Sequence, residues 1–282
     1  MSINGITQVS TCGEQQNKAK PAIAIGAGAV SLGIIRTKLN TDILDQKDKH
    51  LNSGLDTNYM REKINRALSQ SGMKNKGVKI LDFARYENNP PKITISSNKP
   101  TIKDFIRAIA RRVKFNDVNI ARNGDNSFYF TNFNKILINT NKQPLAGFHE
   151  IGHSINNNSS KFWRTIIKTR GLTTALPFWI AAIAIGKGKK SEGETSTGAI
   201  DSATTFIKNN AGTLSIASSV PIIAEELKAS QRGNKLAKEL LSPDIAQKVI
   251  KSNRLGAMTY IVGAGAMALA TVAGSKIRDF IA

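Results

Sequence analysis

Four stretches without a charged residue constrain this chain more than any other feature of its sequence. They cover residues 21–35, 171–186, 209–224 and 255–275, and basic segments separate them. Only the last stretch, of 21 residues, has the roughly 20 residues that a helix needs to cross a bilayer. The three shorter stretches are rich in Ala, Gly and Ser, a composition that suits close contact between helices. We therefore expect about four apolar helices, the shorter three being either membrane segments or buried helices of a soluble core.

The longest uncharged stretch carries a regular stripe of small residues. Ala266, Ala270 and Gly274 recur every four residues, so a helix places them on one face. Such a face allows the backbone of a second helix to approach closely. We expect another helix to pack against it.

The chain is strongly basic, with 40 Lys and Arg against 20 Asp and Glu and a net charge of +20. If all four stretches span a membrane, segments 36–170 and 225–254 share one side and hold most of the flanking basic residues. The positive-inside rule places that side in the cytoplasm, facing anionic lipid. Nucleic acid is the other common partner of basic proteins, but aromatic residues make up only 6% and no nucleic-acid-binding motif occurs. We expect a multi-pass protein of the inner cell membrane, with a lipid bilayer rather than nucleic acid as its partner.

The N-terminal part is predicted to be a polar tail over 1–20 followed by a membrane anchor over 21–35. No small-residue cleavage site follows the apolar stretch, so we expect it to remain as an anchor. Cys12 is the one cysteine of the chain, which excludes an intramolecular disulfide.

A polar, basic α+β region is expected over 36–142. Met60, Ile64 and Leu68 recur every four residues and predict a helix over 58–70. Segments of β-branched or apolar residues predict strands at 77–84, 91–96, 127–130 and 135–139. Thr101 is a capping residue and predicts a helix at 101–113.

The helix expected at 144–156 contains the motif His149-Glu150-Ile151-Gly152-His153. Residues four apart lie one turn apart on one face, so the imidazoles of His149 and His153 can converge on one metal ion. Glu150 follows the first histidine and can take a proton from the attacking water. Two nitrogen ligands, one further protein ligand and an open position are typical of catalytic zinc. The motif predicts one Zn²⁺ per chain and a hydrolase with Glu150 as general base.

The third zinc ligand is expected to be a carboxylate on a second helix, because no further histidine follows the motif. Glu192 and Glu194 lie in a loop rich in Gly, Ser and Thr, where solvation is expected. Glu225 and Glu226 end the third uncharged stretch and open a polar helix, which suits a ligand. The alternative for this pair is that the carboxylates only complement a helix dipole.

From residue 145 to residue 275 the chain resembles the membrane-embedded zinc metallopeptidases of the YugP-like type, related to the HtpX-like gluzincins. The resemblance rests on three segments. They are the HEIGH motif at 149–153, Glu226-Leu227-Lys228-Ala229-Ser230-Gln231-Arg232, and Ala257-Met258-Thr259-Tyr260.

This resemblance implies that His149, His153 and Glu226 bind zinc and that Glu150 is the general base. Two features depart from the family. The polar stretch before the motif is longer, and the proline that usually lies close before the glutamate is here Pro221, five residues away. Segment 36–130 matches no family pattern, so substrate selection stays open.

The expected fold is a mainly α-helical membrane protein with a small α+β polar portion and a zincin-like catalytic helix pair. Residues 143–282 form the predicted zinc metallopeptidase core, which includes the three later apolar stretches. The predicted function is a membrane-bound metalloendopeptidase that hydrolyses a peptide or protein substrate on the cytoplasmic side. Strand 135–139 is expected to pair with an extended substrate. The alternatives are a non-catalytic membrane scaffold and a soluble metalloprotease toxin or effector.

Overall fold

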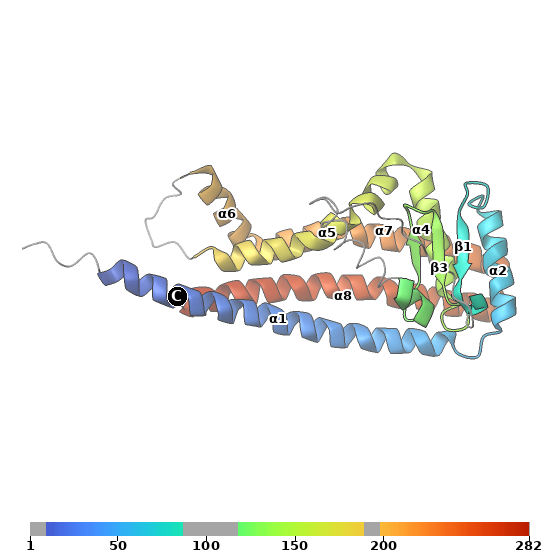
Figure 1. Ribbon diagram of the computed structural model, residues 1–282, viewed down its shortest axis with the longest axis horizontal. Coiled ribbons are helices and arrows are strands. Elements are labelled where there is room, and N and C mark those ends of the chain that lie inside the picture. The colour runs from blue at the N-terminus through green and yellow to red at the C-terminus, as the bar shows by residue number, and fades with distance from the viewer. Residues whose placement is uncertain (1–9, 87–117, 189–197, 282) are drawn as a thin grey trace, which may run out of the picture. The chain divides into compact units, whose positions relative to one another are not determined.

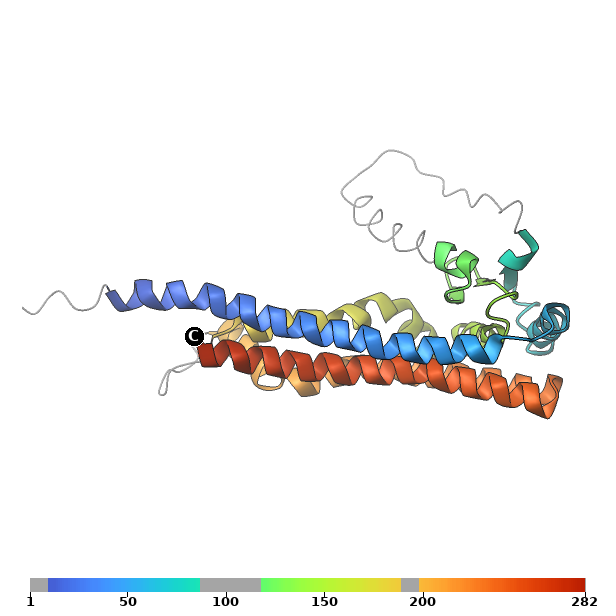
Figure 2. The ribbon, with the colours of Figure 1, turned by 90° about the horizontal axis from the view of Figure 1, so that it is seen from below.

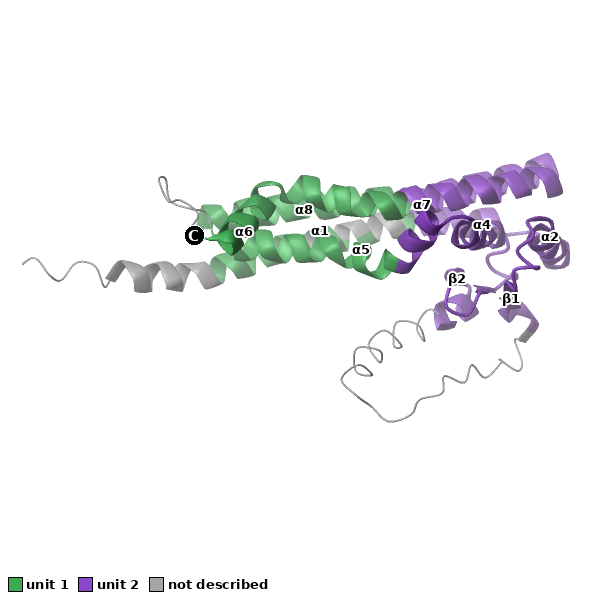
Figure 3. Ribbon diagram, turned by 90° about the horizontal axis from the view of Figure 1, so that it is seen from above, with its two compact units in different colours: residues 1–43, 169–223, 259–282 green, residues 44–168, 224–258 purple. Residues whose placement is uncertain are grey.

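The computed structural model describes residues 10–86, 118–188 and 198–281, with the backbone alone at 10–20, 32, 36, 37, 39–41 and 86. The chain is mainly helical and contains a small three-stranded sheet (Figure 1). Its residues group into two compact units (Figure 3). Unit 1 contains Met1–Ile43, Thr169–Ile223 and Thr259–Ala282, and unit 2 contains Leu44–Lys168 and Ala224–Met258.

Long helices explain why neither unit is contiguous in sequence. Four helices contribute residues to both units, namely α1 (Ser10–Asn52), α5 (Lys161–Gly186), α7 (Ala211–Leu240) and α8 (Pro243–Ile281). The predicted division into consecutive stretches, with boundaries at 20, 35 and 142, stays a prediction about sequence regions, and each compact unit combines several separate stretches. A helix that continues through a charge boundary carries residues of both units, and hydropathy alone does not reveal this.

Unit 1 is built from helices. It combines parts of α1, α5 (Lys161–Gly186), α7 and α8 with the short helix α6 (Ala199–Asn209). α1 and α8 lie side by side in both ribbon views (Figures 1 and 2).

The contact between α1 and α8 depends on small residues. A Cβ at Gly33 would lie 2.4 Å from that of Ala270, and a Cβ at Gly26 would lie 2.7 Å from the carbonyl oxygen of Gly274. Two positions of the predicted stripe therefore form a helix contact, which confirms that expectation.

All four uncharged stretches lie in helices, namely α1, α5, α7 and α8. Among the described helices only α8 is long and apolar enough to cross a membrane, and 28% of its apolar window is buried. The stretch in α1 forms a shorter apolar helical segment, Pro21–Ile35. In α5 and α7 the apolar part continues directly into charged turns, which limits the apolar length. The structure thus contains one candidate membrane helix among the described residues, and the expectations of about four apolar helices and of multi-pass insertion stay predictions.

Unit 2 contains the sheet, with strand order β1-β3-β2. β1 (Lys79–Asp82) runs parallel to β3 (Lys135–Ile138), and β2 (Phe128–Phe130) runs antiparallel to β3. The register pairs Ile80 with Ile136 and Tyr129 with Ile136. β1, β2 and β3 match three of the predicted strands within about two residues at each end.

β3 is the central strand, which overturns one prediction. Both of its edges already pair, one with β1 and the other with β2. Residues 135–137 thus have a paired strand on each side, which leaves no free edge there for an extended substrate, so the predicted substrate pairing at 135–139 is wrong. The sequence predicts strands here but not their order in the sheet. The strand predicted at 91–96 and the helix predicted at 101–113 lie outside the described residues.

The core of unit 2 lies between the sheet and four helices. Alternate residues of β3 divide between its two faces, with Ile136 and Ile138 on one face and Leu137 on the other. The first face packs with α2 (Thr57–Gln70), α4 (Ala146–Ser159), α7 and α8, and this cluster includes Phe148 and Ile151 of α4. These apolar side chains fix α4 in place, since burying such side chains is worth about 1.5–3 kcal/mol each.

Candidate metal centre

The start of α4 is held by a side chain from another helix. The N-cap residue Leu145 has no capping side chain of its own. Its backbone N–H instead donates to Oδ1 of Asn52 at 3.0 Å, and Asn52 is 4% exposed at the end of α1. This bond satisfies one of the unpaired donors at the helix start. It places the motif helix against the end of α1 within unit 2.

Two glycines let α4 and α7 cross with their backbones almost in contact. A Cβ at Gly152 would lie 2.1 Å from the carbonyl oxygen of Ala229 on α7. A Cβ at Gly233 on α7 would lie 2.6 Å from the carbonyl oxygen of Phe148 on α4. Neither position accepts a larger residue without separating the helices. The crossing brings the histidine face of α4 against the start of the polar part of α7.

Three side chains converge at this crossing. Nε2 of His149 lies 2.9 Å from Nε2 of His153 and 3.0 Å from Oε2 of Glu226. Nε2 of His153 lies 3.6 Å from the same carboxylate oxygen. His153 and Glu226 are buried, and His149 is partly exposed. Among the described residues these three form the one group of His, Cys, Asp and Glu side chains that could hold a metal ion.

The donor atoms fit the size of a zinc site. Zinc bonds nitrogen and oxygen at about 2.0–2.1 Å, so a tetrahedral site places its ligand atoms about 3.3 Å apart. The three observed separations, 2.9, 3.0 and 3.6 Å, lie around that value. The two imidazole rings stand nearly perpendicular, at 85°, so they approach the common point from different directions. Two neutral nitrogens and one carboxylate oxygen also match the ligand chemistry of catalytic zinc.

Neighbouring side chains orient both histidines through their other ring nitrogens. Nδ1 of His153 lies 2.9 Å from Oε1 of Glu225, and Asn156 donates to that same oxygen at 2.8 Å. Nδ1 of His149 lies 3.2 Å from the hydroxyl of Ser230. With a metal ion at the two Nε2 atoms, Nδ1 of His153 would donate to Glu225 and Nδ1 of His149 would donate to Ser230. Each histidine therefore has a partner that can orient its ring for metal binding.

Two carboxylates surround His153 and change its protonation. Burial by itself disfavours the charged imidazole, but Glu226 and Glu225 outweigh it and hold the pKa of His153 well above its ordinary value. Burial likewise works to raise the pKa of Glu225, but the charge and hydrogen bond of His153, with help from Asn156, keep it below its ordinary value. Without a metal, the site thus favours an ion pair between His153 and its carboxylate partners.

Two more acidic side chains lie close to these residues. Glu150 is buried on α4, between the two histidines in sequence, with 5% of its surface exposed. Asp48, near the end of α1, is partly buried, and burial raises the pKa of its carboxyl. Hydrogen bonds from Ser252 and Asn52 and the charge of His149 oppose that rise. Asp48 thus adds a fourth carboxylate to the environment of the histidines, alongside Glu150 and the α7 pair.

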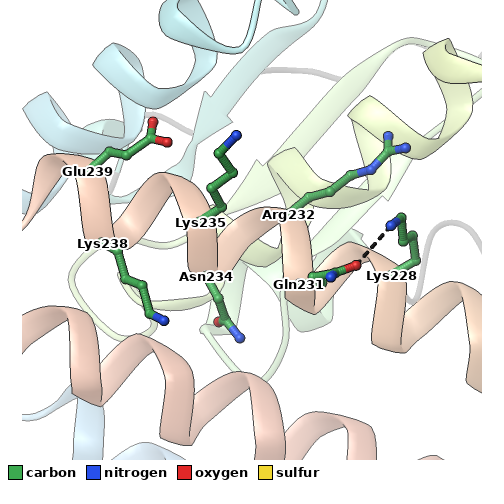
Figure 4. A pocket seen from close by; sticks show the side chains of 7 residues that line it. All are labelled: Lys228, Gln231, Arg232, Asn234, Lys235, Lys238 and Glu239. Carbon is green, nitrogen blue, oxygen red and sulfur yellow. Dashed lines mark hydrogen bonds between the residues drawn. The ribbon is translucent and has the colours of Figure 1, made fainter.

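The outer side of α7 carries the opposite charge (Figure 4). A hollow on its surface is lined by Lys228, Gln231, Arg232, Asn234, Lys235, Lys238 and Glu239. All of these residues belong to one helix, so the hollow is the space between long side chains rather than an enclosed cavity. Arg232 is partly buried, and burial lowers its pKa while the charge of Glu225 opposes that change. α7 therefore presents carboxylates to α4 and cations to the solvent.

The structure brings together the predicted ligands and separates the two candidate glutamates. Glu226 joins the histidines, and Glu225 instead contacts the back of His153. The roles of Ser230 and Asn156 were not predicted, because neither residue lies in the HExxH motif. Ser230 lies four residues after Glu226, one turn along the same helix face. That spacing could have indicated a residue near the metal centre, once Glu226 was known to be there.

Two tyrosines of the chain hydrogen-bond other side chains. The hydroxyl of Tyr129 donates to Asn134 at 2.7 Å and accepts from Asn157 at 3.0 Å. Burial raises the pKa of Tyr129, and hydrogen bonds with Asn157 and Asn158 oppose that rise. Tyr260 belongs to unit 1, where it accepts a hydrogen bond from Arg170.

Comparison with known proteins adds no further evidence. No protein-family model, curated protein or solved structure matches this chain. The interpretation of the metal centre therefore rests on its own residues and their geometry.

Proposed function

We propose that this protein is a membrane-bound zinc metalloendopeptidase. The observation that supports the proposal most is the convergence of two imidazole nitrogens and one carboxylate oxygen from α4 and α7 within about zinc-ligand spacing. Buried Glu150 on the same helix supplies the carboxylate that such hydrolysis requires. Glu225 and Ser230, which lie at the Nδ1 atoms of the two histidines, support metal binding because they can orient the rings with Nε2 toward the ion.

Each residue has a distinct part in the proposed reaction. His149, His153 and Glu226 would hold the ion, which when bound would supply Lewis-acid activation of the scissile carbonyl and of a water molecule. Glu150 would accept the proton of the attacking water and return it to the leaving amine. Glu225 and Ser230 keep the imidazole rings in place through the reaction.

Attachment to a membrane is part of the proposal. α8 has the length and composition of a spanning helix, and 28% of its apolar window is buried. Exposed side chains in this stretch include Leu269 and Ile261. The hydrocarbon of a bilayer would cover this apolar surface, which is unfavourable in contact with water.

Cleavage of an unfolded protein tests the proposed activity. Full-length protein in neutral detergent is loaded with one equivalent of zinc and incubated with casein, and fragments are identified by mass spectrometry. We expect cleavage by the wild type and a rate at least about 100-fold lower for Glu150→Gln, because a general base contributes about 10²–10⁴ in rate. Glu62→Gln is the matched control, since that side chain is 69% exposed in α2.

Two results would contradict the proposal. Equal cleavage by wild type and Glu150→Gln would assign the activity to a contaminant. No cleavage of casein or of a peptide library by zinc-loaded wild type would favour the scaffold alternative.

A further inference from the structure

Unit 1 contains an open groove between four helices. Its volume is about 370 Å³, within the roughly 300–1,000 Å³ of small-molecule sites. α1, α5, α7 and α8 all contribute side chains, and every residue that lines the groove belongs to unit 1. The groove therefore differs from the metal centre, whose residues all belong to unit 2.

The helix contacts show how the groove is ordered along its length. Gly26 meets Gly274 and Gly33 meets Ala270, so α1 and α8 run antiparallel. Arg170 bonds Tyr260, and Ser275 donates to the carbonyl of Ala184 fourteen residues later in α5, so α5 and α8 run in the same direction. These pairings allow residues on the three helices to be compared level by level.

Polarity changes from one end of the groove to the other. Apolar Ile34, Phe178 and Met267 lie near one level, on α1, α5 and α8 respectively. Tyr260 lies seven residues before Met267, about 10 Å along the helix. Lys38 lies toward the Tyr260 end, one turn beyond Ile34. On α1, α5 and α8 the charged and tyrosine side chains thus lie toward one end of the groove. α7 runs antiparallel to α8 and adds apolar Ile222 and Ile223 at that end and Ser219 nearer to Met267.

Two cations mark the polar end. The side chain of Lys38 lines the groove and is exposed. Arg170 donates a hydrogen bond to the hydroxyl of Tyr260, and its guanidinium carbon lies 5.3 Å from the centre of that ring. Tyrosine beside basic residues is the side-chain set found where a helix leaves the hydrocarbon of a bilayer. Tyr260 lies near the start of the uncharged stretch of α8, where that boundary is expected.

We propose that this groove binds an anionic phospholipid, with its phosphate at Lys38 and Arg170 and an acyl chain along Ile34, Phe178 and Met267. Charge complementarity at one end and apolar lining at the other favour a ligand that has both parts. A neutral lipid lacks the charge for Lys38 and Arg170, and a soluble phosphate leaves the apolar part uncovered. The inference rests on the proposed membrane attachment and not on the proposed peptidase activity.

Lipid retention in neutral detergent tests the site. Full-length protein is mixed with phosphatidylglycerol or phosphatidylcholine, and bound lipid per chain is measured by native mass spectrometry. We expect one phosphatidylglycerol per chain and about 10- to 30-fold weaker retention of phosphatidylcholine, because each cation near the headgroup contributes about fivefold. The double variant Lys38→Gln, Arg170→Gln should lower phosphatidylglycerol retention to the phosphatidylcholine level.

Two further variants separate a site from general attraction. Lys276→Gln removes an exposed cation elsewhere in unit 1 and should leave retention unchanged. Ala264→Phe places a ring in the groove and should reduce retention of both lipids at least about tenfold, with thermal unfolding and zinc content checked in parallel. If this variant misfolds, the charge variants still test whether the groove binds an anionic lipid. Competition with glycerol 3-phosphate or an apolar peptide provides a second test.

Three outcomes would overturn the proposal. An equal loss with Lys276→Gln would show non-specific charge attraction. Retention of glycerol 3-phosphate as strong as that of phosphatidylglycerol would assign the groove to a soluble phosphate. Displacement of phosphatidylglycerol by an equal amount of an uncharged apolar peptide would assign it to a peptide segment. Wild-type protein that retains phosphatidylglycerol but binds no zinc or cleaves no peptide would contradict the proposed function. The lipid site would still be supported in that case.

Discussion

Two adjacent glutamates of α7 meet opposite sides of the same imidazole. Glu226 lies at the Nε2 side of His153, at 3.6 Å, and Glu225 lies at its Nδ1 side, at 2.9 Å. In a metal site these positions have different consequences, because one carboxylate binds the ion and the other orients a ligand. The order of the two residues along the helix does not reveal this division.

The division predicts different effects for two nearly identical substitutions. Glu225→Gln removes the charge that orients His153 but no ligand, so zinc should still bind at one per chain with about 10- to 100-fold weaker affinity. Affinity is measured by competition with a chromophoric chelator. Unchanged affinity would show that Glu225 does not support His153, and complete loss of zinc would make Glu225 a ligand.

The raised pKa of His153 predicts a pH dependence in the metal-free protein. A group whose pKa is raised on folding stabilises the fold below its ordinary pKa of 6.5, and that stabilisation is lost as pH rises through the folded value. Stability should therefore fall by up to about 1.4 kcal/mol per pH unit above 6.5. Glu225, with a lowered pKa, stabilises the fold above its ordinary value of 4.5 and loses this effect in acid.

Thermal unfolding of chelator-treated protein between pH 5 and 9 checks this dependence, and His153→Gln is the variant for comparison. In that variant, the decrease of stability with rising pH above the ordinary histidine pKa should disappear. Zinc should bind more tightly as pH rises through the same range, because the metal displaces the proton from the ring. Equal slopes in wild type and variant would assign the pH dependence to another group.

At the scale of elements, the crossing of α4 and α7 builds the metal centre. Gly152→Ala would place a methyl group 2.1 Å from the carbonyl oxygen of Ala229, so the helices must separate. We expect a loss of about 1–3 kcal/mol in the free energy of unfolding, as for other overpacked cores, together with weaker zinc binding although no ligand changes. Denaturant unfolding and zinc titration measure both effects.

Gly256→Ala is the control for that substitution. Gly256 also lies within a helix of unit 2, and nothing lies within 4 Å of an added Cβ there. This change should raise stability by about 0.5–1 kcal/mol, because alanine loses less backbone freedom than glycine. Similar effects of the two substitutions would mean that the close crossing does not position the site.

Local patterns in the sequence predict the elements but not their partners. The four-residue spacing of Met60, Ile64 and Leu68 predicts α2, and the structure buries all three residues. The HExxH spacing predicts one face with two histidines. The contact of Gly152 with Ala229 depends on packing between segments that are distant in sequence. The central position of β3 depends on such packing as well. No local periodicity contains that information.

At the scale of the whole molecule, α8 connects the two units and carries the one membrane-length apolar stretch in the described part of the chain. Leu269 lies within that stretch and is 74% exposed. Leu269→Lys should weaken membrane attachment, because a lysine near the middle of a spanning helix costs about 2.5–3.5 kcal/mol. The fraction released by alkaline carbonate is the measurement.

Phe280→Lys is the matched control, since Phe280 is 92% exposed and lies beyond the uncharged stretch. It should leave the released fraction unchanged. Wild-type protein that is extracted from membranes without detergent would contradict membrane attachment and favour the soluble alternative.

Zinc content is the most direct test of the metal centre. Zinc per chain is measured by mass spectrometry of the metal in detergent-purified wild type, in Glu226→Ala and in Glu62→Ala, which alters an exposed carboxylate. We predict about one zinc in the wild type and in Glu62→Ala, and less than about a tenth of that in Glu226→Ala, because removing one of three protein ligands opens the site. Zinc near zero in the wild type, or equal zinc in wild type and Glu226→Ala, would contradict the assignment of His149, His153 and Glu226 as a zinc site.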